Sequence, residues 1–447
     1  MGGAVKVAVI GAGSTYTPEL VEGFIKREGI LPLAELRLMD IDPGKLGIVG
    51  GLAGRMLEAA GSRARLSLGT DLDDALRDTD FIVCQIRIGG LEARALDERI
   101  PLRHGFIGQE TTGLGGLANA LRSIPVVAGI AQRTTELAPG AWFVNFANPS
   151  GLVAEALVNG LGLERVVGLC NVPVNMRADI AALAPPGAKV ELEYVGLNHF
   201  SWVTKVWFDG REVLAEALRS GASFGAMRNV PGSDFEPGLL AALGAIPNIY
   251  LQYYYHRERQ LEHLRAAPMT RAEECMAIER GLLSSYADPS LKEKPAALEK
   301  RGGHLYSEAA VSLIEAIAND TGAVHVVNTR NAGALGFLGP RDVAEIACRV
   351  GRSGPVPIPV GDFDHPHIEG MVRMMKAYER CAARAALEGD RGAAIEALLL
   401  HPLAGDYDRC VAALDELLAA EAAWLPRFAR RAGAAAPADA HSRGGAR

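Results

Sequence analysis

The chain has little of what marks a nucleic-acid-binding, membrane or disulfide-stabilised protein. Its formal net charge is −7, so it has no basic excess for nucleic acid or an acidic lipid surface. No apolar run approaches the roughly 18 residues of a membrane span, and the N-terminus lacks a basic segment followed by an apolar one. The six cysteines show no paired spacing, which is typical of free thiols in a reducing compartment. We therefore expect a cytoplasmic protein without nucleic-acid or membrane partners.

The first residues follow the pattern of a nucleotide-binding strand, turn and helix. Val5–Ile10 is a continuous apolar run, typical of a buried parallel strand, and a helix is predicted to begin near Pro18. Glycines between them let the backbone approach a pyrophosphate, and the helix N-terminus supplies amide donors. The residues predicted to bind the nucleotide are Gly11, Gly13, Ser14 and Thr15. Tyr16 replaces the third glycine of the usual fingerprint, so a tight turn without a ligand stays an alternative.

Strand-like and helical segments alternate through the first half of the chain. The strand-like segments are Glu35–Met39, Arg65–Leu68, Phe81–Gln85, Ala141–Phe146 and Val166–Leu169. The helical ones are Pro43–Ala60, Asp73–Arg77, Gly116–Leu137 and Leu152–Asn159. This alternation predicts an α/β fold with a Rossmann-type, doubly wound, mainly parallel sheet. Asp40 follows the second strand, where a carboxylate can accept hydrogen bonds from an adenosine ribose.

A cysteine and a histidine follow two other strand-like segments. Cys170 and Asn171 are predicted in an exposed loop, because Pro173 should prevent an immediate return to regular structure. Asn198 and His199 lie in a polar break within the strand-like stretch Tyr194–Thr204. A thiolate and an imidazole together suit a divalent transition metal. A buried cysteine and a hydrogen-bonded core histidine are the open alternative.

Two further segments are expected as loops at the carboxyl ends of the strands, where such sheets bind ligands. The first begins at Arg87 and includes Arg94 and Glu110 among glycines and other charged residues. A solvated helix surface is the alternative for its other arginines. The second contains Asn148, whose amide can bind a sugar or only cap the next helix.

A tyrosine-rich tract stands out because aromatic residues make up only 6% of the chain. Tyr250, Tyr253 and Tyr254 share one face if the tract is helical. Such a stripe ordinarily packs in a core or an interface.

Several of these segments, in this order, resemble glycoside hydrolase family 4, whose members need NAD and a divalent metal. They are GAGSTYTPEL, RIGGLEARALDERIPL…GQETTG, NFANPSG, GLCNVP and GLNHFSW. The resemblance continues through IPNIYLQYYY, RGGHLYSEAAVSLIEAIANDTGAVHVVNTRN and ALLLHPL, and it extends to about Phe428.

The resemblance implies a mechanism of oxidation and elimination. NAD takes a hydride from C3 of the sugar, a base removes the C2 proton, the C1 aglycone leaves, water adds, and the hydride returns. It further implies Mn²⁺ or another divalent metal held by Cys170 and His199. Tyr250 is the expected base, with Tyr253 as the second choice. Glu110 would orient a water molecule, although a salt bridge to an arginine is an equal alternative.

The resemblance also implies a substrate. Arg94 matches the position that holds a 6-phosphate, and the CNVP sequence around Asn171 resembles the 6-phospho-β-glucosidases. We therefore expect a phosphorylated disaccharide or β-glucoside, bound by Arg94, Asn148, Asn171 and Asn198, with Asn171 also in a catalytic role and Arg87 at the cofactor. Another family 4 glycosidase is the alternative, and an NAD-dependent dehydrogenase or a non-catalytic sugar-phosphate sensor is a more distant one.

The expected organisation has three parts. Residues 1–171 would form the NAD-binding Rossmann-like domain. Residues 172–429 would form a mixed α+β, mostly helical domain for catalysis, substrate binding and assembly into a homodimer or homotetramer. Residues 430–447 are small, polar and aperiodic, as in a disordered tail.

Overall fold

A six-stranded parallel sheet forms the first half of the protein. The computed structural model describes residues 3–219, 235–301 and 305–428. The strands are β1 (Val5–Ile10), β2 (Leu33–Met39), β3 (Arg65–Gly69), β4 (Phe81–Cys84), β5 (Trp142–Asn145) and β6 (Val166–Gly168). They pair in parallel in the order β3-β2-β1-β4-β5-β6, which is the Rossmann order. The predicted fold class is confirmed.

Helices cover this sheet close to their predicted bounds. They are α1 (Thr17–Arg27), α2 (Pro43–Ala59), α3 (Leu72–Leu76), α5 (Gly113–Leu137) and α6 (Ser150–Glu155), which continues as a π-helical turn, Ala156–Gly160. By length and composition α5 could cross a membrane, but 83% of its most apolar window is buried inside the protein, as in the core helix of a soluble protein.

The charged segment after β4 is a helix, so the predicted loop is wrong. It forms α4 (Gly90–Arg103), which begins directly after Gly89, a residue with φ of 77°. The sharp turn requires this left-handed conformation, which glycine adopts without strain. The helix buries charged residues alongside apolar ones, because its acidic and basic side chains pair inside the protein. Pattern-based reasoning therefore did not recognise it.

A helix also begins directly after the short loop at Cys170 and Asn171, contrary to the prediction that Pro173 prevents an immediate return to regular structure. It is α7 (Val172–Ala181), with Pro173 in its first turn. Proline is tolerated there because the first amides of a helix have no intrahelical partner. Cys170 is consequently fixed between a strand and a helix, and it is buried.

The sheet continues into the second half of the chain. Three antiparallel strands, β11 (Ala323–Arg330), β12 (Val343–Gly351) and β13 (Gly354–Pro357), extend it from the edge of β6 to nine strands. Strands from both sides of residue 171 thus share one sheet. The division into functional domains at that residue stays a prediction, and residues 430–447 lie outside the described residues.

A smaller antiparallel sheet contains the hairpin that carries His199. Its strands are β7 (Val190–Leu197), β8 (Phe200–Phe208), β9 (Arg211–Glu212) and β10 (Ile246–Pro247). The stretch Tyr194–Thr204 is therefore not one strand, because the chain reverses at Asn198 and His199.

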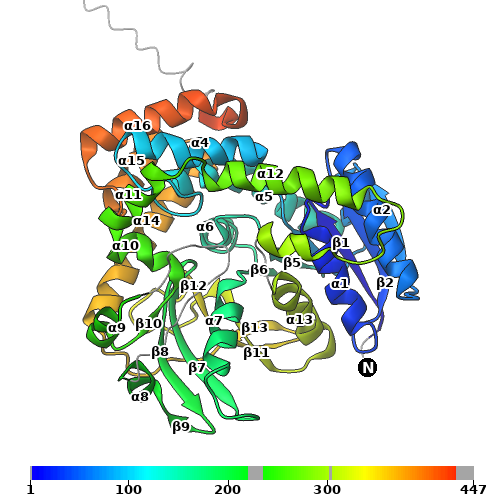
Figure 1. The fold of residues 1–447 in the computed structure, drawn as a ribbon, viewed down its shortest axis with the longest axis horizontal. Helices are drawn as coiled ribbons and strands as arrows, with labels where there is room; N and C mark the ends of the chain where they lie inside the picture. The colour runs from blue at the N-terminus through cyan, green and yellow to red at the C-terminus, as the bar shows by residue number, and fades with distance from the viewer. Residues whose placement is uncertain (1–2, 220–234, 302–304, 429–447) are drawn as a thin grey trace, which may run out of the picture.

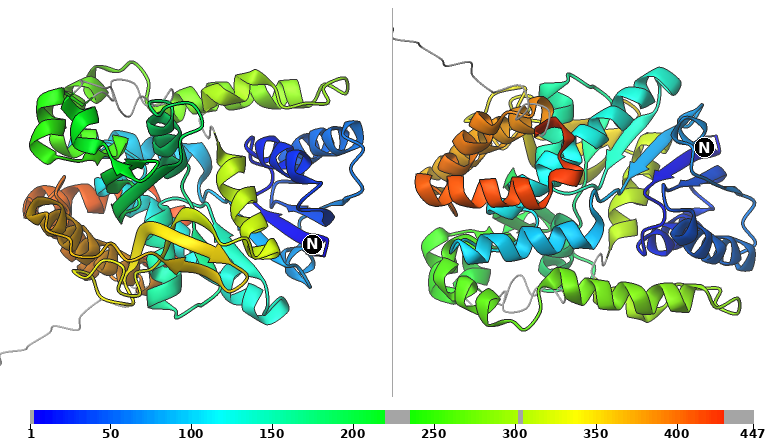
Figure 2. Two further views of the ribbon diagram at one scale, coloured as in Figure 1. Left: turned by 90° about the horizontal axis from the view of Figure 1, so that it is seen from below. Right: turned by 90° about the horizontal axis from the view of Figure 1, so that it is seen from above.

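The rest of the second half is mostly helical, as predicted. Its helices are α8 (Leu214–Arg219), α9 (Pro237–Leu243), α10 (Gln252–Tyr255), α11 (Arg257–Ala266), α12 (Arg271–Tyr286), α13 (Tyr306–Asn319), α14 (Pro366–Glu388), α15 (Arg391–Leu400) and α16 (Tyr407–Ala420). The long helix α12 packs against both α4 and α2, and so spans from the helical half to the Rossmann half (Figures 1 and 2).

Candidate functional site

A cavity of about 1150 Å³ lies at the carboxyl ends of the parallel strands. Its wall includes residues at or just beyond the ends of five of them: Ile10, Met39, Gln85, Phe146 and Leu169. Helices α4, α11 and α12 contribute the opposite side. The cavity exceeds the roughly 300–1,000 Å³ of a pocket for one small ligand, so it has room for a cofactor and a substrate together.

Most of the predicted site residues line this cavity. They are Gly11, Gly13, Ser14, Asp40, Arg87, Arg94, Glu110, Asn148, Cys170, Asn171, His199, Tyr250 and Tyr253. Thr15 and Asn198 do not line it.

The glycine turn after β1 is closed tightly against Asp40. The Gly13 amide donates a hydrogen bond of 2.7 Å to Asp40 Oδ2, and a Cβ on Gly13 would lie 2.9 Å from the same oxygen. Gly11 has φ of +87°, and a Cβ there would lie 3.0 Å from the backbone of Ile86. Gly11 is therefore required by its positive φ and its close approach to the backbone, and the turn leaves Asp40 on the cavity wall.

Thr15 is the one predicted nucleotide-binding residue that the turn carries away from the cavity. Its side chain is buried, and its hydroxyl makes no hydrogen bond with the described residues. Its carbonyl oxygen accepts a hydrogen bond of 2.8 Å from Tyr286 on α12. Thr15 thus ties the turn to α12.

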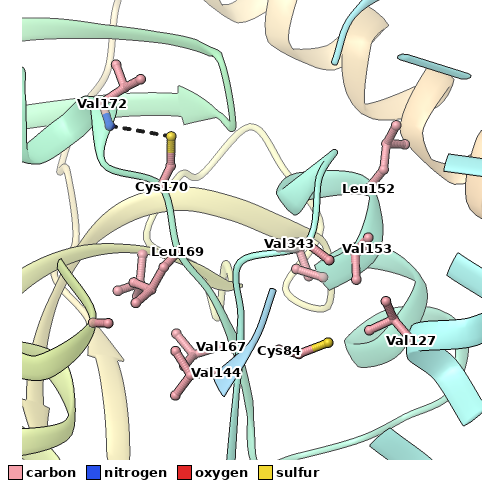
Figure 3. Packing of buried hydrophobic residues seen from close by; sticks show 14 of the residues in the cluster. Cys84, Val127, Val144, Leu152, Val153, Val167, Leu169, Cys170, Val172 and Val343 are labelled. Atoms are coloured by element: carbon pink, nitrogen blue, oxygen red, sulfur yellow. Dashed lines mark hydrogen bonds between the residues drawn. The ribbon is translucent and has the colours of Figure 1, made fainter. Parts of the chain in front are cut away.

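Cys170 and His199 face each other across the end of β6. The distance from Cys170 Sγ to His199 Nε2 is 3.3 Å, and the Val172 amide donates to the same sulfur at 3.4 Å (Figure 3). One metal ion bound at about 2.3 Å from a sulfur and about 2.1 Å from a nitrogen holds the two atoms roughly this far apart. The donor pair therefore fits a shared transition metal.

The protonation state of His199 suits a metal ligand, whereas that of Cys170 depends on the metal ion. Burial lowers the pKa of His199 to about 4, so the imidazole is neutral at physiological pH and can act as a ligand. Its Nδ1 lies 3.0 Å from the hydroxyl of Thr111, which fixes the ring. Burial and the carboxylate of Glu345 raise the pKa of the Cys170 thiol, so its deprotonation needs a cation.

Cys170 and His199 are a pair of candidate ligands without a third protein ligand of these types in the described part of the chain. No group of three or more His, Cys, Asp or Glu side chains that could hold a metal occurs among residues 3–219, 235–301 and 305–428. A metal ion here would complete its coordination shell with substrate or water.

Tyr250 lies flat against His199. The two ring centroids are 3.8 Å apart and the planes are inclined by 8°. Tyr253 is one step further along the wall, with its centroid 6.3 Å from that of Tyr250. The prediction that Tyr254 shares this face is wrong. Ile249–Leu251 is a 3₁₀ turn rather than part of an α-helix, and Tyr254 instead contacts Thr112.

The half-buried Arg87 and the buried Arg94 and Glu110 form a cluster beside the tyrosines. Glu110 pairs with Arg87 and, at 3.0 Å, with Arg94, whose Nε is 2.7 Å from Glu98. Burial tends to raise the pKa of Glu110, but the charges of Arg87 and Arg94 outweigh it and lower the pKa to about 2. Glu110 is an anion in a salt bridge, which is the alternative that the sequence left open.

Asn198 is placed behind the site. Its Nδ2 donates to Glu345 at 2.9 Å, and its Oδ1 accepts from the Gly151 amide at 3.3 Å. It lines a separate cavity of about 20 Å³ behind His199. Its predicted contact with substrate has no support in this position.

Arg301 is a residue of the cavity wall that pattern reasoning missed. It is buried, its guanidinium lies over the ring of Tyr16 at 5.1 Å, and its Nε makes no hydrogen bond with the described residues. It ends the 3₁₀ turn Ala296–Arg301, and it opens the segment RGGHLYSE that the resemblance includes. A lone arginine before two glycines gave no signal by itself.

The fold and this cavity define a Rossmann-type, nucleotide-binding class of protein with a thiol–imidazole pair at the sheet edge. Residues 6–184 match the model of the family 4 glycosyl hydrolases, and residues 194–404 match the family 4 glycosyl hydrolase C-terminal domain. The chain belongs to glycoside hydrolase family 4.

Relatives with names and structures support this membership. The chain is 45% identical over 433 residues to a Bacillus subtilis (strain 168) protein named "Probable 6-phospho-beta-glucosidase", covering 95% of this chain and 98% of that one. The 6-phospho-beta glucosidase of Thermotoga maritima, solved with manganese, NAD+ and glucose-6-phosphate, matches with a TM-score of 0.86 and 36% identity, over 94% and 99% of the two chains. A 6-phospho-alpha-glucosidase from gut microorganisms, solved with NAD and Mn2+, has the same TM-score but 27% identity, over 95% and 99%.

Proposed function

We propose that this protein hydrolyses 6-phospho-β-glucosides with NAD and Mn²⁺ as cofactors. The observation that carries the proposal is the stack of the Tyr250 ring on the His199 ring, whose Nε2 lies 3.3 Å from the Cys170 sulfur. All three residues line the same cavity as the glycine turn and Asp40. The relatives named as β-enzymes are more similar in sequence than the α-enzyme, which supports the β anomer.

Each part of the cavity has a place in this function. Gly11, Gly13 and Ser14 would hold the pyrophosphate of NAD, and Asp40 the ribose. Arg87 would stand at the cofactor end. Asn148 and Asn171 would bind sugar hydroxyls through their amides.

The 6-phosphate would be held by buried arginines. Arg94 is the expected residue, and a guanidinium suits a phosphate because it can donate two parallel hydrogen bonds. In this structure it already pairs with two carboxylates, whereas Arg301 has an Nε without a hydrogen bond to the described residues. We infer that Arg301 shares the phosphate with Arg94.

When bound, NAD exchanges a hydride with C3 of the sugar and Mn²⁺ supplies a Lewis acid at the oxygen on C3. Cys170 and His199 would hold the metal ion, and they fix its place relative to Tyr250. The phenolic oxygen of Tyr250 removes the C2 proton, which lets the aglycone at C1 depart. Tyr250 then returns a proton to C2 after water has added at C1.

Tyr250 needs help to act as a base. Burial is the largest influence on its pKa and raises it, as do the nearby Cys170, Tyr253 and Glu110, while Arg94 lowers it. A divalent cation at the Cys170–His199 pair adds a stronger positive field, and so favours the phenolate. The anionic Glu110 holds Arg94 and Arg87 in place and can accept a hydrogen bond from water.

The domain organisation, oligomeric state and location of the protein are part of the proposal. We infer residues 1–171 as the NAD-binding part, residues 172–429 as the catalytic part, a homodimer or homotetramer, and a cytoplasmic location. Six unpaired cysteines and a phosphorylated substrate, which cells keep inside the membrane, support the location.

The test is turnover of p-nitrophenyl β-glucoside 6-phosphate with and without NAD and Mn²⁺. We expect release of p-nitrophenol only when both are present. The α anomer and the unphosphorylated β-glucoside are the matched substrates, and both should react far more slowly. Preferred turnover of the α anomer would instead make the protein a 6-phospho-α-glucosidase, and net formation of NADH would make it a dehydrogenase.

A further inference from the structure

Glu345 is a buried carboxylate directly behind the candidate site. It lies on β12 in the nine-stranded sheet, and only 1% of its surface is exposed. It does not line the cavity, so it touches neither cofactor nor substrate there. Its Oε1 accepts from the amides of Asn198 at 2.9 Å and Asn328 at 3.4 Å. Its Oε2 accepts from the hydroxyls of Tyr194 at 2.9 Å and Ser201 at 3.4 Å.

One branch of these hydrogen bonds fixes the hairpin that carries His199. Tyr194 is on β7, Ser201 is on β8, and Asn198 is in the turn itself, next to His199. The Asn198 side chain also hydrogen bonds to Cys170 and to the amide of Gly151. Glu345 thus connects the turn at Asn198 and His199 to strand β12 of the nine-stranded sheet.

A second branch reaches the strand that leads to Cys170. Asn328 on β11 is paired with Gly168 on β6, and its Nδ2 contacts the Gly168 carbonyl at 3.4 Å. A Cβ on Gly168 would lie 2.9 Å from the Cβ of Asn328, so the two strands are as close as they can be. Cys170 follows two residues after Gly168.

A third branch reaches the base. Ser201 accepts a hydrogen bond of 3.1 Å from the side chain of Asn248, and the Asn248 amide donates to the Ser201 carbonyl at 2.8 Å. Asn248 Oδ1 in turn accepts from the backbone amide of Tyr250 at 3.0 Å. This hydrogen bond sets the 3₁₀ turn that points Tyr250 at His199.

We propose that Glu345 is a positioning residue that holds Cys170, His199 and Tyr250 in one arrangement. The inference rests on the proposed function, because it takes Cys170 and His199 as the metal ligands and Tyr250 as the base. Four donors converge on one carboxylate that joins the hairpin β7–β8 to strands β11 and β12, more than 100 residues further along the chain. Partners behind metal ligands commonly change metal affinity by about 10- to 100-fold.

The test compares two substitutions at this position. Glu345→Met keeps the volume but removes both acceptor oxygens. Glu345→Gln keeps the oxygen that accepts hydrogen bonds from Asn198 and Asn328. Its NH₂ group faces the hydroxyls of Tyr194 and Ser201, which can rotate to accept hydrogen bonds from it. Asp342→Asn is the control, because Asp342 is an equally buried carboxylate just before β12 that bonds to Gly339 and Arg380 outside this set.

The readouts are the Kd for Mn²⁺, the Kd for NAD, and the absorption spectrum with Co²⁺ in place of Mn²⁺. A thiolate bound to Co²⁺ gives a charge-transfer band, which reports the bond from Cys170 directly. We expect Glu345→Met to weaken Mn²⁺ binding by about 10- to 100-fold and to shift or reduce this band, with NAD binding nearly unchanged. Glu345→Gln and Asp342→Asn should stay within about threefold of the wild-type Kd and keep its spectrum.

A wild-type spectrum and Kd in Glu345→Met would overturn the inference. So would equal losses in Glu345→Gln and Glu345→Met, because the charge and not the hydrogen bonds would then matter. If Glu345→Met does not fold, Asn328→Ala removes only the branch towards Cys170, and wild-type metal binding in that variant overturns the inference. A missing thiolate band in the wild-type protein would contradict the metal site itself, and the inference with it.

Discussion

His199 is held in a backbone conformation that few residues adopt. It is the second residue of a two-residue hairpin turn and has φ of 59°, which costs a non-glycine residue about 1 kcal/mol or more. The imidazole gains from this conformation a fixed direction, towards Cys170 on one side and against the ring of Tyr250 on the other. A strained residue kept in place by its surroundings is a common feature of binding sites.

Cys170→Ser tests the proposed role of the Cys170 thiolate as a metal ligand. The hydroxyl is a weaker ligand for a transition metal than a thiolate, so we expect loss of most activity and a large rise in the Kd for Mn²⁺. NAD binding should change little, because the glycine turn lies on another strand. The measurements are activity after Mn²⁺ titration and NAD affinity by calorimetry. Full activity in this variant, or in wild-type protein treated with EDTA, would refute the metal role.

Tyr250→Phe tests the base. The substitution deletes one hydroxyl and keeps the ring on His199, so metal and NAD binding should persist while turnover falls by at least about 100-fold. Wild-type product made in D₂O should carry deuterium at C2, whereas direct displacement at C1 leaves that hydrogen in place. Mass spectrometry of the product decides between them.

Tyr253→Phe is the matched control for this variant, since Tyr253 also lines the cavity and burial raises its pKa to about 12. It should retain most activity and C2 exchange. A dead Tyr253→Phe beside an active Tyr250→Phe would move the base by one helical turn, while product without solvent deuterium would refute the elimination route.

Arg94→Ala tests the phosphate contact. Loss of one bidentate contact costs about 2–4 kcal/mol, or about 30- to 1000-fold in kcat/KM for the phosphorylated substrate. Arg94→Lys keeps the charge and should retain part of the preference for phosphorylated over plain glucosides. If Arg94→Ala keeps that preference and Arg301→Ala loses it, Arg94 only supports Glu110 and Glu98, the partners that it has in the structure.

At the scale of elements, the sequence predicted those strands and helices that residues within the same segment determine. Strands such as β1 and β4 were recognisable because each is an apolar run buried on both faces. Cys170 and His199 could be predicted as a pair because each follows a strand and because the family resemblance implied that both bind one metal ion. The helix α4 could not be recognised, because its buried residue Asp97 finds its partner, Arg122, on another helix.

The same limit applies to Asn198. Its partner Glu345 is 147 residues away in the sequence, so nothing near Asn198 indicates that its amide is already engaged. The start of α7 at Val172 was missed for a different reason, because the proline that follows, Pro173, favours both a loop and a first helical turn. Long-range partners and ambiguous residues therefore account for most of the errors.

The buried group of Arg122, Asp97 and Glu421 makes stability depend on pH. Arg122 pairs with Asp97 and also with Glu421, which follows α16, so two carboxylates share one cation. Burial and then the charge of Asp97 raise the pKa of Glu421 above its ordinary value. A carboxyl with a raised folded-state pKa favours folding while it is protonated, and this contribution is lost as pH rises from its ordinary pKa through the folded one.

Glu421→Gln should remove this loss, because the amide stays neutral and can still accept from Arg122. We expect the variant to be more stable than wild type by about 1 kcal/mol or more at pH 9, and to differ less at pH 5. Chemical denaturation at both pH values measures the difference. Glu345 and Glu379, whose pKa values burial raises to about 7, leave a residual dependence of the same sign. An unchanged pH profile in Glu421→Gln would show that the pKa of Glu421 does not differ between the folded and unfolded states.

At the scale of the whole molecule, ion pairs join the two halves of the chain both at the cavity wall and away from it. Arg27 on α1 pairs with Glu308 at 2.6 Å and Glu315 at 3.1 Å on α13. Lys45 on α2 pairs with Glu279 on α12 at 2.7 Å, across the cavity wall. The helix α12 that carries Glu279 also lies beside α4, as Figure 1 and the right-hand view of Figure 2 show. Cofactor and substrate would therefore bind between elements that are already packed together.

This packing predicts that residues 1–171 do not fold stably by themselves, even though they contain the whole nucleotide-binding pattern. Without residues 172–428, β6 would expose the edge that pairs with β11, α1 would lose its contact with α13, and Arg122 would lose Glu421. The full chain should then unfold in one transition, and saturating NAD should shift that whole transition. At 100 times its Kd a ligand adds about 2.7 kcal/mol to the folded state.

Circular dichroism and thermal melting of the fragment 1–171 and of the full chain, each with and without NAD, test this prediction. The full chain should show one melting transition that NAD raises, while the fragment should melt broadly or aggregate and show no response. The fragment 1–351 is the matched control, because it restores β11 and β12 at the edge of β6 and the contact of α13 with α1. It should recover helical and strand signal that 1–171 lacks. A fragment 1–171 that melts cooperatively and binds NAD with the affinity of the full chain would show instead that the boundary at residue 171 separates two independent folding units, and that the shared sheet is only a docking surface between them.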